Sequence, residues 1–308
     1  MAATETKSPL AQASSGLEKS RITGAGGQSF YLSWEIGSGF SAVVYRAIDE
    51  NDPMKTNYAC KVIAKTLLNL KEKENTIREI SILRAAQHEN TLRMIDLFET
   101  PTHLFIVMPL MHEDLFDKIS KRHRFTEADA CEVLLQIARG LAYLHSVHIC
   151  HRDIKPENIL CSSEPEHFRV LIADYGLAKF FGRDQLLTSN CGSEHYVAPE
   201  VLLHSGPYSE ACDIWSFGVV AYILFTGCFP FDDSVMTLSG VYHKSNLEVV
   251  GISAAGRAFI DSLFKLVPEE RPTAAQLVEN WFNPRMVPQT DLTSFVSHLP
   301  DLKLGLDP

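Results

Sequence analysis

Apolar residues in the first third of the chain follow the alternating pattern of β-strands. Five runs rich in β-branched and aromatic residues predict strands: SFYLSWEI, SAVVYRAI, NYACKVIA, LRMIDLFET and HLFIVMPL. A helical spacing interrupts them over residues 71–87. Four apolar residues of this stretch are spaced to share one face: Ile77, Ile80, Ile82 and Leu83.

After Pro109 the hydrophobic pattern changes from strands to helices. Residues 126–146 begin with Thr126, a favourable N-cap residue that is followed by acidic residues in the first turn. Residues 211–226 are apolar nearly all round, which predicts a helix buried at the centre of its lobe. Two more helices are expected at residues 254–267 and 273–282.

This order of elements predicts an α+β protein with two lobes. The strand-rich lobe is expected over residues 30–108 and the mainly helical lobe over residues 112–283. A chain of 308 residues is long enough to give each lobe its own core. A cleft between two such lobes is the default place for a ligand.

The two ends of the chain differ from the lobes between them. Residues 1–29 are rich in Ala, Ser and Thr and end in GAGG, which predicts a disordered tail. Residues 284–308 form a second tail, which is a candidate autoinhibitory segment. Its apolar residues fall at helical spacing, so that they are placed to dock on the helical lobe: Leu292, Phe295, Val296 and Leu299.

Composition and charge narrow the possible partners and the compartment. The net charge is 28 − 38 = −10, which argues against a general nucleic-acid or anionic-membrane surface. No apolar run reaches the roughly 18 residues of a membrane span. Seven cysteines without C-x-x-C pairs favour a reducing compartment. We therefore expect the protein in the cytosol, or in the cytosol and the nucleus.

The first candidate for chemistry is the stretch ICHRDIKPENIL at residues 149–160. Apolar residues at both ends enclose a run of charged groups that a core strand would not tolerate. Asp153 is a candidate base, and Lys155 is placed to neutralise phosphate charge. The side-chain oxygens of Asn158 and of Asp174, which lies in IADYG, are the hard ligands that Mg²⁺ prefers.

A second candidate is the glycine turn IGSGFSAVV, followed by Lys61 in an apolar strand. Gly37 and Gly39 let the backbone approach a ligand, although a G-x-G match alone is weak and often marks only a structural turn. The strand-like VVYRAI that follows favours a phosphate-covering hairpin over a dinucleotide site, which needs a helix there. Lys61 needs an anion, and Glu79 is the candidate partner; a purely structural ion pair is the alternative.

Six motifs, in this order and spacing, resemble those of eukaryotic protein kinases: GSGFSAVV, YACK, HRDIKPEN, ADYG, APE and DIWSFG. The resemblance covers about residues 30–283. Within the family, LFDKI and CGSEHYVAPEVL are most similar to the calcium/calmodulin-dependent protein kinase group. The resemblance implies the bilobal kinase fold and transfer of the γ-phosphoryl group of ATP to serine or threonine hydroxyls with Mg²⁺. The alternative is a pseudokinase, a scaffold that binds nucleotide or partners without turnover.

The resemblance also implies a role for each motif residue. Lys61 would hold the α- and β-phosphates while paired with Glu79, Asp153 would be the catalytic base, and Lys155 would contact the γ-phosphate. Asn158 and Asp174 would bind Mg²⁺. The implied nucleotide-binding residues are Gly37, Ser38, Gly39, Val44, Ala59, Lys61, the gatekeeper Met108, the hinge residues Leu110 and Met111, Leu160 and Asp174.

The same resemblance implies three features of the helical lobe. Glu200 would pair with Arg271, and Asp213 would brace the catalytic loop. Asp114 and Glu157 would favour an arginine three residues before the target, because a carboxylate pairs well with a guanidinium. Ser193 would mark specificity for serine and threonine.

The sequence leaves more than one hypothesis open for how the activity is regulated. An upstream activating kinase would modify Ser189, or Thr188 beside it, and Arg152 would clamp the phosphate; a loop active without phosphate is the alternative. We do not expect calmodulin binding, because the C-terminal tail is acidic and calmodulin targets are basic. Cys191 is either a redox switch or a plain packed thiol.

The histidines of residues 145–151 have two possible interpretations. HSVHICH places histidines three residues apart, either as a metal site or, more simply, as packed side chains: His145, His148 and His151.

Overall fold

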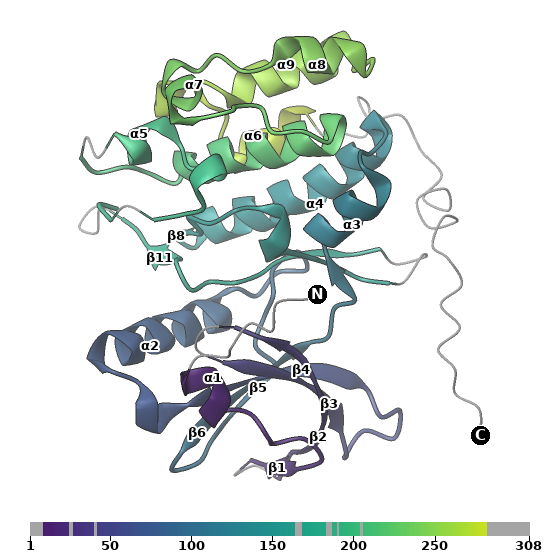
Figure 1. Ribbon diagram of the computed structural model, residues 1–308, viewed down its shortest axis with the longest axis vertical. Helices are drawn as coiled ribbons and strands as arrows, with labels where there is room; N and C mark the ends of the chain where they lie inside the picture. Colours follow the sequence, from purple (N-terminus) through teal and green to yellow (C-terminus); the bar gives the residue numbers. More distant parts are fainter. Residues whose placement is uncertain are drawn as a thin grey trace, which may run out of the picture. The chain divides into compact units, whose positions relative to one another are not determined.

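The chain divides into two compact units, Met1–Met111 and His112–Pro308. The computed structural model describes residues 9–24, 27–39, 42–163, 168–182, 187–189, 191–203 and 206–281. The first unit is built mainly of strands and the second mainly of helices, so the predicted α+β architecture is confirmed (Figure 1).

The described part of the first unit is built on a six-stranded antiparallel sheet in the order β1-β2-β3-β4-β6-β5. The five strands that the alternating pattern predicts are all present, and β1 is an addition. The strand bounds are β1 (Arg21–Thr23), β2 (Ser29–Ser38), β3 (Val43–Asp49), β4 (Asn57–Ala64), β5 (Asp96–Glu99) and β6 (His103–Pro109).

The two faces of this sheet carry different side chains, because successive residues of a strand point to opposite faces. One face forms the apolar core of the unit and includes Tyr45, Cys60 and Val107. On the opposite face Val44 is aligned with Lys61 in the register of the sheet. The sheet therefore separates a packed core from a face that carries the candidate phosphate-binding lysine.

The expected disorder of residues 1–29 is wrong for the part that the structure describes. The short helix α1 (Pro9–Ala13) contacts β4, and β1 pairs with the start of β2. Ser14 is fully buried, and its carbonyl oxygen accepts a hydrogen bond of 3.1 Å from the hydroxyl of the buried Tyr45. Leu17 packs against the core of the sheet. These few contacts order a segment whose composition shows little hydrophobic signal.

Helix α2 (Leu70–Ala85) begins at a capping box between Asn69 and Glu72 and follows the short 3₁₀ turn η1 (Lys65–Leu67). Ile82 and Leu83 are buried as expected, whereas Ile77 is 65% exposed. The prediction for Ile77 is wrong because five residues turn a helix by about 140° beyond a full turn, which places Ile77 away from Ile82.

The second unit is organised around helix α6 (Ala211–Thr226), which is buried nearly all round as the sequence predicts. Helices α4 (Glu127–Ser146) and α9 (Ala254–Leu263) pack against it, and Thr126 caps α4. The remaining helices and turns are α3 (Leu115–Arg122), η2 (Pro156–Asn158), η3 (Glu194–Tyr196), α5 (Pro199–Leu202), α7 (Ser234–Ser239), α8 (Lys244–Val249), η4 (Pro268–Glu270), α10 (Ala274–Gln276) and η5 (Leu277–Trp281).

Short strands of the second unit support the candidate catalytic loop. Pairs form between β7, β9 and β10 and between β8 and β11. Their bounds are β7 (Glu113–Asp114), β8 (Ile149–Cys150), β9 (Ile159–Cys161), β10 (Val170–Ile172) and β11 (Lys179–Phe180). The apolar ends of ICHRDIKPENIL thus lie in β8 and β9, as the sequence suggests for an anchored loop.

The C-terminal helices are shorter than the sequence predicts. The helix expected over 254–267 ends at Leu263, and the one expected over 273–282 is three residues of α10 followed by the π-helical turn η5. The proposed regulatory tail at residues 284–308 lies outside the described residues. Within the part that the structure does describe, no helix combines the length and the apolar character needed to span a membrane.

Candidate active site

In the first unit, Lys61 and Glu79 form the ion pair that the sequence suggests. Lys61 lies on β4 and Glu79 on α2, and the distance from Lys61 Nζ to Glu79 Oε1 is 2.5 Å. Both side chains are largely but not fully buried. Glu79 therefore fixes the direction of the Lys61 ammonium group on this face of the sheet.

The glycine turn forms the hairpin between β2 and β3. Gly37 is aligned with Val44, and the amide of Gly39 donates to the carbonyl of Ala42 at 2.9 Å. Gly37 and Gly39 have open space where a side chain would lie. A strand follows the glycines, as a phosphate-covering hairpin requires and a dinucleotide fingerprint does not. Ser38 ends β2, and the tip of the turn, residues 40 and 41, lies outside the described residues.

The proposed adenine contacts of the first unit share the face that carries Lys61. Ala59 lies two residues before Lys61 on β4 and is aligned with Met108 on β6, so all three side chains point to that face. The hinge residues Leu110 and Met111 are half-buried at the end of the unit. Leu160 belongs to the second unit and lies on β9.

In the second unit, the candidate base Asp153 is held by a compact group of polar contacts. Asp153 Oδ1 accepts hydrogen bonds from the hydroxyl of Ser193 at 2.9 Å and from its amide at 3.1 Å. Asp153 Oδ2 accepts one from Asn158 Nδ2 at 2.9 Å and lies 3.1 Å from Lys155 Nζ. Lys155 also donates to Ser193 Oγ at 2.7 Å. Within the second unit, Asp153, Lys155, Asn158 and Ser193 are thus together.

Asn158 and Asp174 are suited to a hard cation. Nδ2 of Asn158 is used by Asp153, which leaves the amide oxygen as the ligand atom. Asp174 is exposed and has a φ of 60°, and the Ala173 amide before it donates to the Asn158 carbonyl at 2.8 Å. An amide oxygen and a carboxylate on two segments joined in this way are the kinds of ligand that fit Mg²⁺.

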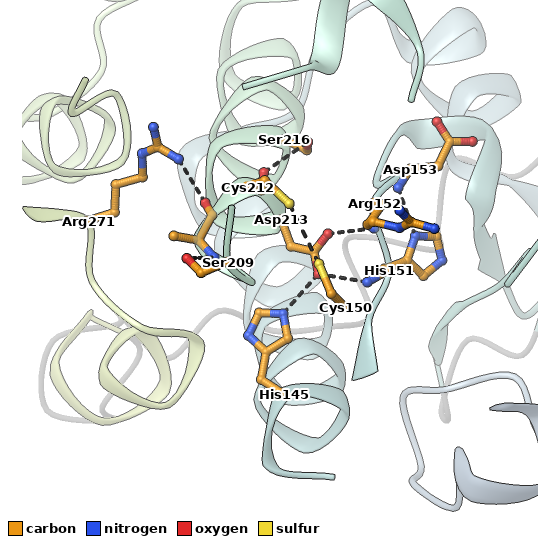
Figure 2. A network of polar contacts seen from close by, with 11 residues as sticks. His145, Cys150, His151, Arg152, Asp153, Ser209, Cys212, Asp213, Ser216 and Arg271 are labelled. Carbon is orange, nitrogen blue, oxygen red and sulfur yellow. Dashed lines mark hydrogen bonds and ion pairs between the residues drawn. The ribbon is translucent and has the colours of Figure 1, made fainter. Parts of the chain in front are cut away.

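A buried carboxylate from α6 braces the catalytic loop (Figure 2). Asp213 Oδ2 accepts from the His151 amide at 2.9 Å, and Oδ1 accepts from the Arg152 amide at 2.7 Å. Nε2 of His145 lies 2.9 Å from Asp213 Oδ2. Burial opposes the charge of Asp213, but these partners outweigh it and lower the pKa of the carboxyl group. The bracing role was expected, whereas sequence reasoning missed His145 as a partner.

Arg152 joins the loop to the segment that carries the candidate phosphosite. Its guanidinium donates to the Leu177 carbonyl and, at 2.7 Å, to Ser189 Oγ. Tyr208 approaches the same guanidinium at 3.3 Å. Ser189 and Thr188 are both exposed, and Ser189 is the one that contacts Arg152. This contact places Ser189 where a phosphate would meet a cation.

The proposed substrate-recognition acids lie on neighbouring elements. Asp114 caps α3 by accepting from the Asp117 amide at 2.8 Å, and burial raises the pKa of its carboxyl group. Glu157 is exposed on η2, which contacts α3 and β7.

Glu113, beside Asp114, has a role that no motif indicates. Its carboxylate is buried and pairs with Lys118 at 2.8 Å and with Lys121 at 2.5 Å. Ion pairing with the two lysines outweighs the opposing effect of burial and lowers the pKa of Glu113.

The other predicted contacts of the helical unit are also present. Arg271 forms a bidentate pair with Glu200, with N–O distances of 2.7 and 2.8 Å. The three histidines of HSVHICH do not converge on a metal site. His145 meets Asp213, His148 lies edge-on to Phe181, and His151 bonds to a backbone carbonyl, so the packing reading is favoured.

Comparisons with known proteins agree with this geometry. The family model described as protein kinase domain matches residues 30–282. Over 261 residues the chain is 40% identical to a probable myosin light chain kinase of Dictyostelium discoideum, covering 82% of this chain and 74% of the relative. It is 38% identical to myosin light chain kinase A of the same organism, covering 80% and 85%. Human serine/threonine-protein kinase H1 is 36% identical, covering 80% and 59%. The chain therefore belongs to the protein kinase family, in the calcium/calmodulin-dependent group, and is a serine/threonine protein kinase that uses ATP and Mg²⁺.

Proposed function

We propose that this kinase phosphorylates serine or threonine residues that follow an arginine by three positions, with Asp153 as the catalytic base. The observation that carries the proposal is the contact of Asp153 with both Lys155 and Ser193. A carboxylate oriented by three neighbours is suited to accept the proton of a substrate hydroxyl.

Each neighbour of Asp153 has a separate task in the proposal. Lys155 places positive charge where the transferred phosphoryl group becomes more negative, which stabilises the transition state. Ser193 holds Lys155 and Asp153 in one geometry. Asn158 orients Asp153 through its amide nitrogen and contributes its oxygen, with Asp174, to Mg²⁺. The bound ion supplies charge neutralisation at the phosphate oxygens.

The first unit supplies the proposed nucleotide contacts. The turn formed by Gly37, Ser38 and Gly39 would let the backbone lie close over the phosphates, since open space lies where a side chain of either glycine would be. Lys61 would hold the α- and β-phosphates while Glu79 fixes its direction. Phosphoryl transfer then depends mainly on positioning and electrostatics.

Charge supports the preference for a basic residue before the target. Asp114 and Glu157 place two carboxylates on elements that contact each other, and the chain as a whole carries a net charge of −10. An arginine binds a carboxylate through two parallel hydrogen bonds, which makes the preference geometric as well as electrostatic.

Activation by an upstream kinase is the regulatory part of the proposal. A phosphate on Ser189 would receive charge-assisted hydrogen bonds from Arg152, which already donates to the hydroxyl. Calmodulin binding is not part of the proposal, because the acidic tail lacks the basic amphipathic character of its targets.

The experiment measures transfer from ATP and Mg²⁺ to a peptide with arginine three residues before serine, beside a peptide in which that arginine is alanine. Wild type should prefer the arginine peptide, and Asp153→Asn should lose about 10²-fold or more in kcat. Asp114→Asn keeps a capping side chain on α3, so it should reduce the preference without unfolding the helix. Glu157→Gln should do the same, and Asp117→Asn is the matched control on an exposed neighbour.

The outcomes separate the parts of the proposal. Equal rates with both peptides would discard the roles of Asp114 and Glu157 and leave the kinase activity intact. No transfer by wild type, even after an upstream kinase has modified Ser189, would favour the pseudokinase alternative. A myosin light chain is a second substrate to test, because four relatives are named myosin light chain kinases.

A further inference from the structure

Two buried cysteines meet beside the carboxylate that braces the catalytic loop (Figure 2). Cys150 ends β8 and Cys212 is the second residue of α6, and their sulfur atoms are 3.6 Å apart. Each cysteine immediately precedes a partner in the bracing contact, since Cys150 is followed by His151 and Cys212 by Asp213. The kinase reaction assigns no task to either thiol.

We propose that Cys150 and Cys212 are a modification site for oxidants of the peroxide class, and that their reversible disulfide disables phosphoryl transfer. The proposal goes beyond the proposed function and rests on it only for the activity readout. The thiol pair itself is established by the distance, the burial and the two elements that carry it.

Disulfide formation requires a movement that the bracing contact does not accommodate. A disulfide holds its sulfur atoms about 2.05 Å apart, so the two must approach by roughly 1.5 Å. Asp213 bonds to the His151 and Arg152 amides at 2.9 and 2.7 Å, distances that leave little slack. Drawing β8 and the start of α6 together therefore shifts the loop that carries Asp153.

A small cavity lies beside one of the two cysteines. It has a volume of about 10 Å³, roughly the space of one water-sized molecule, and Cys212 and Ser193 are among its lining residues. Cys212 is 5% exposed and Cys150 is fully buried. Cys212 is therefore the thiol that peroxide meets first, and Cys150 is the resolving partner.

The chemistry balances in two steps. The Cys212 sulfur attacks peroxide, the O–O bond breaks, and sulfenic acid and one water form. The Cys150 sulfur then attacks the sulfenic sulfur, the S–O bond breaks, and the disulfide and a second water form. Two thiols are oxidised by two electrons in total and one peroxide is reduced. A dithiol reductant reverses the change by exchange.

Protonation makes this a slow reaction. Burial raises the pKa of the Cys150 thiol well above its ordinary value. A hydrogen bond from Cys150 lowers the pKa of Cys212, but burial and the Asp213 charge raise it further, so it too lies above its ordinary value. Thiolate is the reactive form, so the rate should rise with pH and the pair should respond to sustained rather than brief oxidation.

The other reading of the cluster is a metal site, and the contacts disfavour it. The ligand atoms of Cys150, Cys212 and Asp213 all lie within 4.8 Å of one another. However, the Asp213 carboxylate already accepts hydrogen bonds from two amides and meets His145, which leaves little capacity for a cation.

The experiment treats the full-length protein with hydrogen peroxide over a range of pH and measures two quantities. The first is the Cys150–Cys212 linkage, detected by mass spectrometry after non-reducing digestion. Trypsin with chymotrypsin cleaves after Tyr208 and Trp215, which separates Cys212 from the other cysteines near it in sequence. The second is transfer to the arginine peptide before and after a dithiol reductant.

Cysteine variants test whether the effect of peroxide comes from Cys150 and Cys212. Cys150→Ala and Cys212→Ala each remove the linkage. Cys191→Ser removes the partly exposed thiol that lines the same cavity, and Cys228→Ser removes an exposed thiol elsewhere. Wild type and both serine variants should form the linkage and lose activity about tenfold or more, because small displacements near the reacting groups cost this much. Reductant should restore them, while the two alanine variants keep their activity in peroxide.

Three results would overturn the proposal. One is loss of wild-type activity without the Cys150–Cys212 linkage, and another is protection by Cys191→Ser, which would assign the effect to Cys191. The third is a complete linkage with unchanged activity. An enzyme that transfers no phosphate when fully reduced would contradict the proposed function instead, and the linkage would still be measured. If either alanine variant fails to fold, wild type and the serine variants still decide the matter.

Discussion

The buried ion pair between Glu200 and Arg271 gives the sharpest test of what holds the helical unit together. The Arg271 side chain has no exposed surface, and 14% of the Glu200 side chain is exposed. Besides the bidentate pair, the guanidinium donates to the carbonyls of Lys265 at 2.8 Å and Ala211 at 2.9 Å. It also lies 5.1 Å from the centre of the Trp215 ring. Glu200→Gln keeps the shape of this arrangement and removes its negative charge.

The magnitude follows from what remains buried. An uncompensated guanidinium inside a protein costs about 3–5 kcal/mol of stability. Domains of this kind unfold with a free energy of about 5–15 kcal/mol, so Glu200→Gln removes about a fifth or more of it. At about 2–3 °C for each kcal/mol, the melting temperature should fall by roughly 10 °C.

The assay is urea unfolding followed by tryptophan fluorescence, with thermal unfolding beside it. Glu99→Gln is the matched control, because Glu99 pairs with Lys65 on the surface and is 66% exposed. It should cost less than about 1 kcal/mol. Glu200→Leu combined with Arg271→Met removes both charges and should be less destabilised than Glu200→Gln. Equal and small effects of Glu200→Gln and Glu99→Gln would refute the reasoning from burial.

Two further predictions concern buried polar contacts. Asp213→Asn should destabilise the protein by about 2 kcal/mol near neutral pH. The folded pKa of Asp213 is lowered, so its contribution is full above the ordinary carboxyl pKa and is lost as pH falls through the folded value. Urea unfolding should thus show the difference from wild type shrinking below about pH 4, and a constant difference would contradict this. Tyr45→Phe leaves the Ser14 carbonyl without its hydroxyl donor and should cost about 1–2 kcal/mol. Hydrogen exchange should speed up over residues 9–23, and unchanged exchange there would count against the contact.

The sequence predicts those features that depend on local periodicity or on a motif. The strands from β2 to β6 and the all-apolar helix α6 follow from their hydrophobic pattern, because each is long enough to repeat it. The ion pair of Lys61 follows from the need of a lysine in an apolar strand for an anion. Glu200 and Arg271 are 71 residues apart, and only the resemblance to protein kinases indicated their pairing.

The features that the sequence did not reveal depend on contacts between distant or weakly patterned residues. Glu113 is buried because two lysines of α3 surround its carboxylate, and no motif marks that arrangement. Residues 9–23 are held by distant contacts, among them the hydrogen bond from the Tyr45 hydroxyl, which lies 31 residues beyond Ser14. Cys150 and Cys212 are separated by 62 residues, so only the packing of β8 near the start of α6 brings them together.

The bracing contact of Asp213 does more than satisfy two amides, because it holds a strained backbone. Arg152 has a φ of 68°, a left-handed conformation that costs a residue with a side chain about 1–2 kcal/mol. Two hydrogen bonds oppose relaxation of this backbone, one from the Arg152 amide to Asp213 and one from its guanidinium to the Leu177 carbonyl. When the hydrogen bond from the Arg152 amide to Asp213 is lost, this strain favours movement of Arg152. Asp153 follows Arg152 directly in the chain. The position of the catalytic base therefore depends on a carboxylate of the central helix, so changes that disturb the start of α6 should alter kcat before they unfold the protein.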